Sequence, residues 1–451
     1  MDLTRFRNAA AIALGVTVGC ATTTRAQTAP AEVLHLTVED AIARGEAANL
    51  QALLASASER EAAGARREAL ARLFPQIDLA VSQSREKINL ASFGLPAPAG
   101  ESSLIGPFNV FDGRVALSTP LFDARANAGA RAARLRLESA HLDAVAAHDE
   151  VAAAVAELYL ANVTARARIA SADARFATAQ AVAVEAHDRK EAGRAAGIDV
   201  LRAEVERASA EQQTIAAENA AEQLELTLAR AIGVPPGQVL ALDPLPYVAL
   251  DFPVLPAALA EAQRQRPDLA AARAAVEALA AAEKAVRRER LPRLDLRASW
   301  GPSGPDFDTA EDTYDATAAL RLPLFDGGRI SGAIAAAEAR TSAGRARLAD
   351  LEVGVEVEVR SALLDAAAAT RSVAVAAQAL DLSALQLVQA RDRFSAGVAS
   401  SIEVTAAQEA QALADERSVA ALEAFNRAKI VLARALGVAA DSTARFLRGS
   451  K

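Results

Sequence analysis

Histidine is the side chain most often used for acid–base and metal chemistry near neutral pH, and this chain of 451 residues contains four. His141 and His148 are seven residues apart, so on a helix they would share one face beside Asp149 and Glu150. That arrangement permits a metal ion, but solvated histidines on a helix face are the more common outcome. Since none of the four belongs to a nucleophile, zinc or dinucleotide motif, we expect no catalytic residue, no cofactor and no metal site.

The single cysteine, Cys20, lies in an N-terminal segment with the features of a secretory signal. Two arginines precede a mostly apolar run at positions 9–21, and small residues follow it, which predicts a cleaved signal peptide over residues 1–26. Cys20 also follows Thr17-Val18-Gly19, which resembles a lipoprotein acylation sequence with an unusual first residue. Lipidation of Cys20 therefore stays open as an alternative to its loss with the signal.

The composition is rich in small apolar side chains and poor in large ones: 52% of the residues are hydrophobic and 4% are aromatic. The formal net charge of -8 argues against a nucleic-acid-binding protein, and one cysteine excludes a disulfide-stabilised domain. Alanine supplies most of the apolar content, and alanine favours long helices that pack closely. We therefore expect an extended, mainly helical protein rather than one with a deep globular core.

Proline positions and heptads indicate two long helical intervals. No proline occurs between Pro120 and Pro235, and none occurs after Pro323. Within both intervals, apolar and small residues recur at spacings of three and four, which is the pattern of a coiled-coil seam. The second series follows the first by 204 residues: Val151, Val155, Leu158, Asn162, Ala165, Ile169, Ala172 and Phe176, then Val355, Val359, Ala362, Ala366, Ala369, Val373, Ala376 and Leu380.

Shorter motifs repeat in the same order and with nearly the same spacing. Pro-Leu-Phe-Asp occurs at 120–123 and again at 323–326, and a Gly-Val pair at 233–234 returns at 437–438. These matches predict an internal duplication, with a proline-rich linker between the repeats and a short tail after them. The predicted first repeat, linker, second repeat and tail lie at 27–234, 235–256, 257–438 and 439–451.

Each repeat is predicted to contain a helix, then two strands joined by a loop, a long helix and a shorter helix. After Pro75 and Pro292 the apolar period changes from helical to alternating, which is typical of strands. The predicted fold class is mainly α with a small β part, built as a duplicated strand-strand-long helix-helix unit. The predicted strands lie at about 76–84, 108–121, 293–300 and 315–325. The predicted helices lie at about 124–192, 198–232, 327–396 and 401–436.

Four strands are too few to enclose a pore. An open sheet cannot lie in lipid, because the amide groups at its edges would have no hydrogen-bond partners. No stretch after the signal looks long and apolar enough for a transmembrane helix, so a membrane span would have to be built from strands. Three copies would supply about twelve strands, an even number as such barrels use. Closure therefore implies a homotrimer or a larger ring, and three copies would form a 12-stranded β-barrel continued by an α-helical coiled-coil barrel.

The segment from Arg393 to Val404 contains an aromatic residue followed by a Gly-containing turn between two predicted helices, and 192–200 is a weaker version of it. Both segments are similar to the periplasmic tips of the TolC-like outer-membrane efflux proteins, which are trimeric ducts of Gram-negative bacteria. The resemblance covers nearly the whole mature chain. It implies a channel in outer-membrane lipid whose helical tube enters the periplasm. It also implies a periplasmic adaptor protein and an inner-membrane pump as partners, in efflux or type I secretion.

The same resemblance implies roles for residues at the tips. Glu403 matches an acidic residue that faces the bore, and Asp199 matches an aspartate that helps to hold the entrance shut. The sequence departs from some members at Ala399 and Ala406, where they have an arginine and a second acidic ring. A simpler role for both carboxylates is to complement the dipole at a helix N-terminus. The residues implied to contact the adaptor are Gly193, Gly197, Phe394, Gly397 and Ile402.

Other interpretations stay open. Two arginine-rich segments, Arg287–Arg290 and Arg66–Glu68, precede predicted strands and would either complement helix C-termini or contact lipid headgroups. A periplasmic coiled-coil scaffold without transport activity would share the long helices and the duplication. An exported hydrolase would need a nucleophile constellation, which the sequence does not contain.

Overall fold

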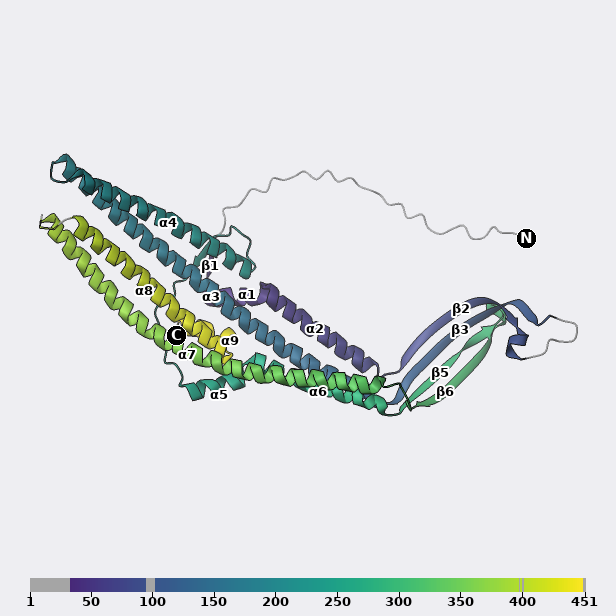
Figure 1. Ribbon diagram of the computed structural model, residues 1–451. Helices are drawn as coiled ribbons and strands as arrows, with labels where there is room; N and C mark the ends of the chain where they lie inside the picture. The colour runs from purple at the N-terminus through teal and green to yellow at the C-terminus, as the bar shows by residue number, and fades with distance from the viewer. Residues whose placement is uncertain (1–32, 95–101, 397, 400, 449–451) are drawn as a thin grey trace, which may run out of the picture.

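The computed structural model describes residues 33–94, 102–396, 398–399 and 401–448. The molecule is elongated, with a sheet at one end and the tips of two helical hairpins at the other (Figure 1). Helices form most of it, which confirms the mainly α fold class with a small β part. The predicted signal peptide, Cys20 and Gly397 lie outside the described residues.

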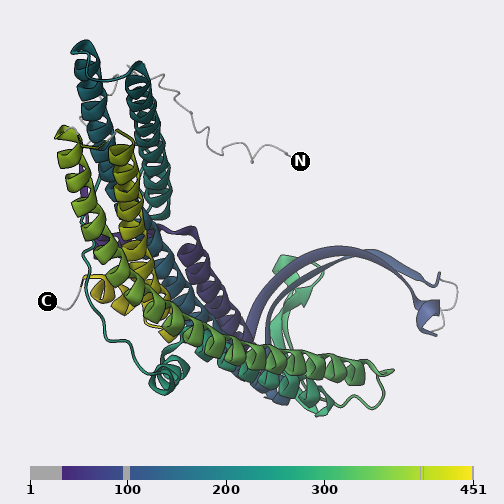
Figure 2. The same cartoon turned by 60° about the vertical axis from the view of Figure 1, so that its left-hand side comes forward.

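Each repeat has two shorter helices before its long strands and a helical hairpin after them. The helices of the first repeat are α1 (Val38–Ala48), α2 (Leu50–Ala71), α3 (Ala124–Glu191) and α4 (Gly197–Ala231). Those of the second are α5 (Leu255–Gln265), α6 (Pro267–Arg287), α7 (Arg329–Ser395) and α8 (Ser401–Leu436). Figure 2 shows the two hairpins running side by side. A further helix, α9 (Ala439–Arg448), occupies most of the predicted tail.

The four long strands form one antiparallel sheet in the order β2-β3-β5-β6. They are β2 (Gln76–Asn89), β3 (Leu104–Asp123), β5 (Arg293–Gly304) and β6 (Glu311–Arg321). Strand β6 ends before the predicted limit at 325. It lies at the sheet edge, and Pro323 has no N–H with which to continue the pairing. The matching Pro120 lies inside β3, at a position that pairs with β5 next to a β-bulge.

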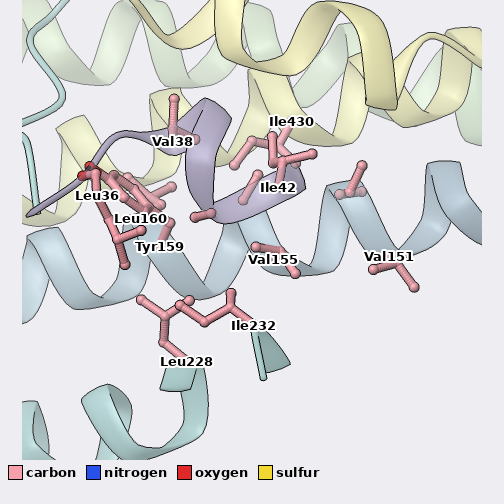
Figure 3. Packing of buried hydrophobic residues seen from close by; sticks show 14 of the residues in the cluster. Leu36, Val38, Ile42, Val151, Val155, Tyr159, Leu160, Leu228, Ile232 and Ile430 are labelled. Atoms are coloured by element: carbon pink, nitrogen blue, oxygen red, sulfur yellow. Dashed lines mark hydrogen bonds between the residues drawn. The ribbon is translucent and has the colours of Figure 1, made fainter. Parts of the chain in front are cut away.

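Two three-residue strands, β1 (Leu34–Leu36) and β4 (Leu240–Leu242), pair in parallel and were not predicted. The hydroxyl of the buried Tyr159 on α3 lies 3.0 Å from the backbone oxygens of both Leu36 and Asp243. The segment that contains Leu36 and the linker are thereby hydrogen-bonded to the middle of α3. Figure 3 shows the apolar cluster around these hydrogen bonds, which includes Val38, Ile42, Val155, Leu160, Leu228, Ile232 and Ile430.

Aspartates at the sheet end cap the two longest helices. The Oδ1 atom of Asp123 accepts a hydrogen bond of 2.8 Å from the backbone N–H of Ala126 in α3. The carboxylate of Asp326 accepts bonds of 3.0 and 2.8 Å from the N–H groups of Gly328 and Ile330. Each Pro-Leu-Phe-Asp motif therefore leads from the sheet into a helix whose first N–H groups are bonded by its aspartate.

The repeated Gly-Val pair has the same place in both repeats. Gly233 and Gly437 follow α4 and α8 with φ angles of 69° and 76°, in the left-handed region. A Cβ atom on Gly233 would lie 2.4 Å from the Cβ of Ala48, and one on Gly437 would lie 2.5 Å from the Cα of Arg266. Ala48 and Arg266 mark the breaks between α1 and α2 and between α5 and α6. Glycine is therefore required by both backbone angle and space.

One helix corrects an expectation from the sequence. Among the described residues, α7 contains an 18-residue window of mean hydropathy 1.3, so by length and composition it could cross a membrane. The expectation that no segment after the signal meets this description is therefore wrong. The helix α7 has 67 residues, whereas a bilayer crossing needs about 20.

Candidate functional site

One face of the sheet is apolar along all four strands. The register places Leu79 opposite Val115, Val115 opposite Trp300, and Trp300 opposite Tyr314. Leu79 is 74% exposed and Tyr314 is 82% exposed, so the chain does not cover this face itself. A continuous apolar face of this kind is normally in contact with lipid or with another protein.

The opposite face of the sheet carries charged side chains. Nε of Arg114 lies 2.8 Å from Oδ2 of Asp112, and Nη1 of Arg114 lies 3.8 Å from Oδ1 of Asp315. Near the helices, Oδ1 of the buried Asp295 lies 2.7 Å from Nε of Arg293. Since successive strand residues point to opposite faces, the alternation in sequence separates an apolar face from a charged one. Barrel walls in membranes show this pattern, with lipid outside and water inside.

The sheet is incomplete at both edges. In the described chain, β2 pairs with β3 alone and β6 pairs with β5 alone, so each has one edge without a neighbouring strand. The edge strands β2 and β6 run in opposite directions, because every pairing between them in the sheet is antiparallel. Strand β6 of one copy therefore has the correct direction to pair with β2 of a second copy.

The turn between α3 and α4 contains two of the glycines that sequence comparison singled out. Gly193 has a φ of 70°, and its N–H and that of Arg194 donate to the carbonyl oxygens of Lys190 and Arg189, at 2.9 and 2.7 Å. These bonds form a Schellman motif, in which glycine is the favoured residue. Gly197 is the first residue of α4. The turn is therefore a tight end to the hairpin.

Asp199 lies in the first turn of α4. Its Oδ2 accepts a hydrogen bond of 3.3 Å from the N–H of Ala196, and its Oδ1 lies 3.8 Å from Nη1 of Arg202. Within one chain these are the contacts of a carboxylate that stabilises a helix N-terminus. A part in closing an entrance would require a second copy of the chain beside it.

Glu403 lies in the first turn of α8 and has a partner that the sequence did not indicate. Its Oε1 lies 3.0 Å from Nε of Arg393, across the turn from the end of α7. Both side chains are exposed, so the pair is in contact with water. An acidic residue at the tip is therefore partly neutralised by its own hairpin.

The two hairpin tips touch each other through Phe394. The guanidinium carbon of Arg189, near the end of α3, lies 3.9 Å from the centre of the Phe394 ring on α7. Such a cation–π contact joins the first repeat to the second. Sequence reasoning marked Phe394 but not Arg189, because periodicity within one repeat does not show which residues face the other repeat.

Ile402 lies in an apolar groove between the starts of α4 and α8. The groove has a volume of about 530 Å³ and is lined by Ile198, Leu201, Val205 and Ile402, with polar side chains at its border. All four apolar side chains are exposed. Hence the tip carries an uncovered apolar surface between the two repeats.

No histidine lies in a metal-binding cluster within the described residues. Across the described residues there is no group of three or more His, Cys, Asp or Glu side chains able to hold a metal ion. The Nδ1 atom of His141 instead lies 3.0 Å from Oε1 of Glu59 at an exposed position.

The chain is 26% identical over 302 residues to the pyoverdine export outer membrane protein OpmQ of Pseudomonas putida, covering 66% of this chain and 63% of OpmQ, less than two thirds of its length. It is 28% identical over 341 residues to the protein CyaE of Bordetella pertussis, covering 73% and 71% of the two chains. The Campylobacter jejuni CmeC outer membrane channel has the same fold, with a TM-score of 0.81 at 17% identity, over 89% of this chain and 86% of CmeC.

The model of one protein family, described as outer membrane efflux protein, matches residues 43–234 and 258–438. The two matched segments correspond to the two repeats, and the description agrees with the TolC-like resemblance. It also agrees with the expected outer-membrane location and with a channel rather than an enzyme. Since the matched segments make up most of the sequence, the chain belongs to the outer membrane efflux protein family.

Proposed function

We propose that three copies of the chain form the exit duct of a tripartite efflux or type I secretion system. Each copy contributes four strands to a barrel of about twelve in the outer membrane, and two helical hairpins to a tube in the periplasm. Substrate enters at the hairpin tips from an inner-membrane pump, which a periplasmic adaptor joins to the duct.

The observation that carries this proposal is the two-faced sheet with two open edges. One face is apolar and uncovered, the other is charged, and neither β2 nor β6 has a second partner in the described chain. Pairing β6 of each copy with β2 of the next satisfies the edge amides and leaves the apolar face toward lipid.

The names of relatives support export as the function. OpmQ is named for pyoverdine export, and CmeC is named as an outer membrane channel. A pyoverdine export protein and an outer membrane channel among the similar proteins agree with a duct whose selectivity is set mainly by its pump.

The tips support an entrance that is regulated by charge and contacted by a partner. Three copies of Glu403 around a narrow axis would form a ring of negative potential that favours cations. The adaptor would contact the glycine turns and the exposed apolar groove that contains Ile198 and Ile402. Asp199 and the Arg189–Phe394 contact would hold the neighbouring helices in the closed arrangement.

Deletion of the gene and complementation in the same strain test the proposal. The deletion strain should become sensitive to at least one compound in a panel of antibiotics, metal ions and siderophores, or should lose export of a protein. An Ile402→Glu variant should lose crosslinks to candidate adaptors, whereas Leu382→Glu, at an exposed site on α7 away from the tip, should retain them. A protein that high salt releases from membranes, without heat-resistant trimers, would instead be a periplasmic scaffold.

A further inference from the structure

Arginines gather where the helices meet the sheet. Arg66 and Arg67 lie near the end of α2, and Arg288 and Arg290 lie in the 3-10 turn Arg288–Arg290 that follows α6. Residues 284–293 contain five basic side chains and one acidic one, although the whole chain has a net charge of -8. Figure 1 shows the ends of α2 and α6 beside the starts of β2 and β5. Positive charge is thus concentrated at one level of an otherwise acidic protein.

These four guanidinium groups differ from the arginines around them. Arg72 pairs with Glu68 at 2.6 Å, and Arg287 pairs with Glu283 at 3.0 Å. By contrast, Arg66, Arg67, Arg288 and Arg290 are exposed and make no hydrogen bond or ion pair with another side chain in the part of the chain that is described. Arg66 and Arg67 precede the last turn of α2, and Lys284 and Arg287 already lie in the last turn of α6, so complementing the helix dipole does not explain the free arginines.

The four arginines also lie away from the charged interior of the junction. A groove of about 650 Å³ opens there between the charged face of the sheet and the helices, lined by residues that include Arg72, Asp123, Glu289, Arg293 and Asp295. None of the four free arginines lines this groove. They therefore belong to another side of the junction.

Exposed apolar side chains lie at the same end of the sheet as these arginines. Leu291 follows Arg290 directly and is exposed. At the same end of the sheet, Leu324 is 90% exposed and Phe325 is 92% exposed. Exposed aromatic and aliphatic side chains at the same level as free arginines are typical of the boundary between the bilayer core and the lipid headgroups.

We propose that Arg66, Arg67, Arg288 and Arg290 form a collar that binds the phosphate groups of anionic phospholipids in the leaflet facing the periplasm. A guanidinium donates two parallel hydrogen bonds to a phosphate, so an exposed arginine is well suited to this contact. The inference rests on the proposed function, because it requires the sheet to lie in a bilayer. It adds to that function a fixed depth in the membrane and a preference for anionic lipid.

The test uses the full-length trimer purified in mild detergent and placed in nanodiscs. A variant with Arg66→Gln, Arg67→Gln, Arg288→Gln and Arg290→Gln is compared with one in which Arg230, Arg264, Arg371 and Arg417 are changed to Gln. The second set is exposed, makes no ion pair within the described residues and lies on helices away from the sheet, so its replacement removes the same charge. Phosphatidylglycerol bound per trimer is measured by quantitative mass spectrometry from equal mixtures with phosphatidylcholine.

We expect the wild type and the matched variant to enrich phosphatidylglycerol several-fold over phosphatidylcholine, and the collar variant to lose that enrichment. Equal enrichment in all three proteins, or equal loss in both variants, would overturn the collar. Heat-resistant trimers and channel conductance are recorded on the same samples. If the wild type forms normal trimers and conducts but shows no lipid preference, the collar alone is refuted. If the wild type fails to form trimers, the proposed function is refuted.

Discussion

At the scale of single residues, Lys429 is the least expected side chain in the helical region. It lies on α8 with no exposed surface, and Nζ has no hydrogen-bond partner within the described residues. The ring of Phe425 lies 4.5 Å from Nζ and offers partial compensation through a cation–π contact. Burial lowers the pKa of Lys429 from its ordinary value of 10.5 to about 8. The charged form is therefore less stable in the folded chain than in water.

This shift predicts a pH-dependent stability. Between about pH 8 and pH 10.5 the unfolded chain holds a proton on Lys429 that the folded chain has released, so stability should rise with pH across this window. Replacing Lys429 with Met should remove that rise and stabilise the protein below pH 8 by about 1–3 kcal/mol. Thermal unfolding over this range checks both effects, with the exposed Lys190→Met as the control. Parallel pH profiles for wild type and Lys429→Met would contradict the assignment.

The pair of Arg393 and Glu403 predicts opposite changes in ion selectivity. Because both side chains are exposed, the ion pair contributes only about 0.2–1 kcal/mol to stability, and its main effect is on the local charge. In planar bilayers with a salt gradient, Glu403→Gln should weaken cation preference and Arg393→Gln should strengthen it. The double variant should return close to wild type, since the two changes cancel in charge. Unchanged reversal potentials in both single variants would exclude Glu403 from the bore.

The sequence alone identified some of these residues and not others. Glu403 and Asp199 could be assigned to the first turns of helices, because their positions follow local signals such as a glycine turn. Arg393, Arg189 and Lys429 could not be assigned, because their contacts depend on which helix packs against which. A lysine in an alanine-rich helix normally indicates a solvated face.

At the scale of elements, three glycines that follow helices predict losses of stability of different size. Gly193, Gly233 and Gly437 all have φ near 70°, at 70°, 69° and 76°, so alanine at any of them costs about 1–2 kcal/mol in backbone strain. A Cβ atom at Gly193 would meet nothing within 4 Å, whereas the other two sites would also clash with the adjacent helix break. Gly233→Ala and Gly437→Ala should therefore lower the melting temperature more than Gly193→Ala does. Equal losses at all three sites would show that packing at the breaks is unimportant.

Helices and strands differed in how well their limits could be predicted. The predicted ends of the four hairpin helices lie within two residues of the observed ones, because proline and glycine mark them. Strand β3 begins at Leu104 rather than near 108, because its length is set by pairing with β2 across a loop. The pair β1–β4 and helix α9 were missed, since three-residue strands and a ten-residue tail carry too short a pattern to recognise.

At the scale of the whole molecule, the open edges of the sheet require neighbouring copies. The alternation of strand direction lets identical copies join β6 to β2 repeatedly, and rotation about one axis closes the ring. Twofold closure would give about eight strands and threefold closure about twelve, and both numbers are even. Two hairpins per copy favour the larger ring, because the tube needs enough helices to surround a bore.

Disulfide mapping tests this closure directly, since Cys20 is the single native cysteine. Ala80→Cys on β2 is combined in turn with Thr313→Cys, Asp315→Cys or Thr317→Cys on β6, all on the charged face by their register. Within one chain these positions lie at opposite edges of the sheet, so a disulfide between them must join two copies. We expect one combination to give covalent trimers on oxidation, and the neighbouring combinations to give weaker bands because their registers do not match. Ala80→Cys with Ser303→Cys, which are separated within one sheet by β3, serves as the control and should give no covalent trimer. A protein that stays monomeric in detergent, with no crosslink from any combination, would show that these strands complete no barrel.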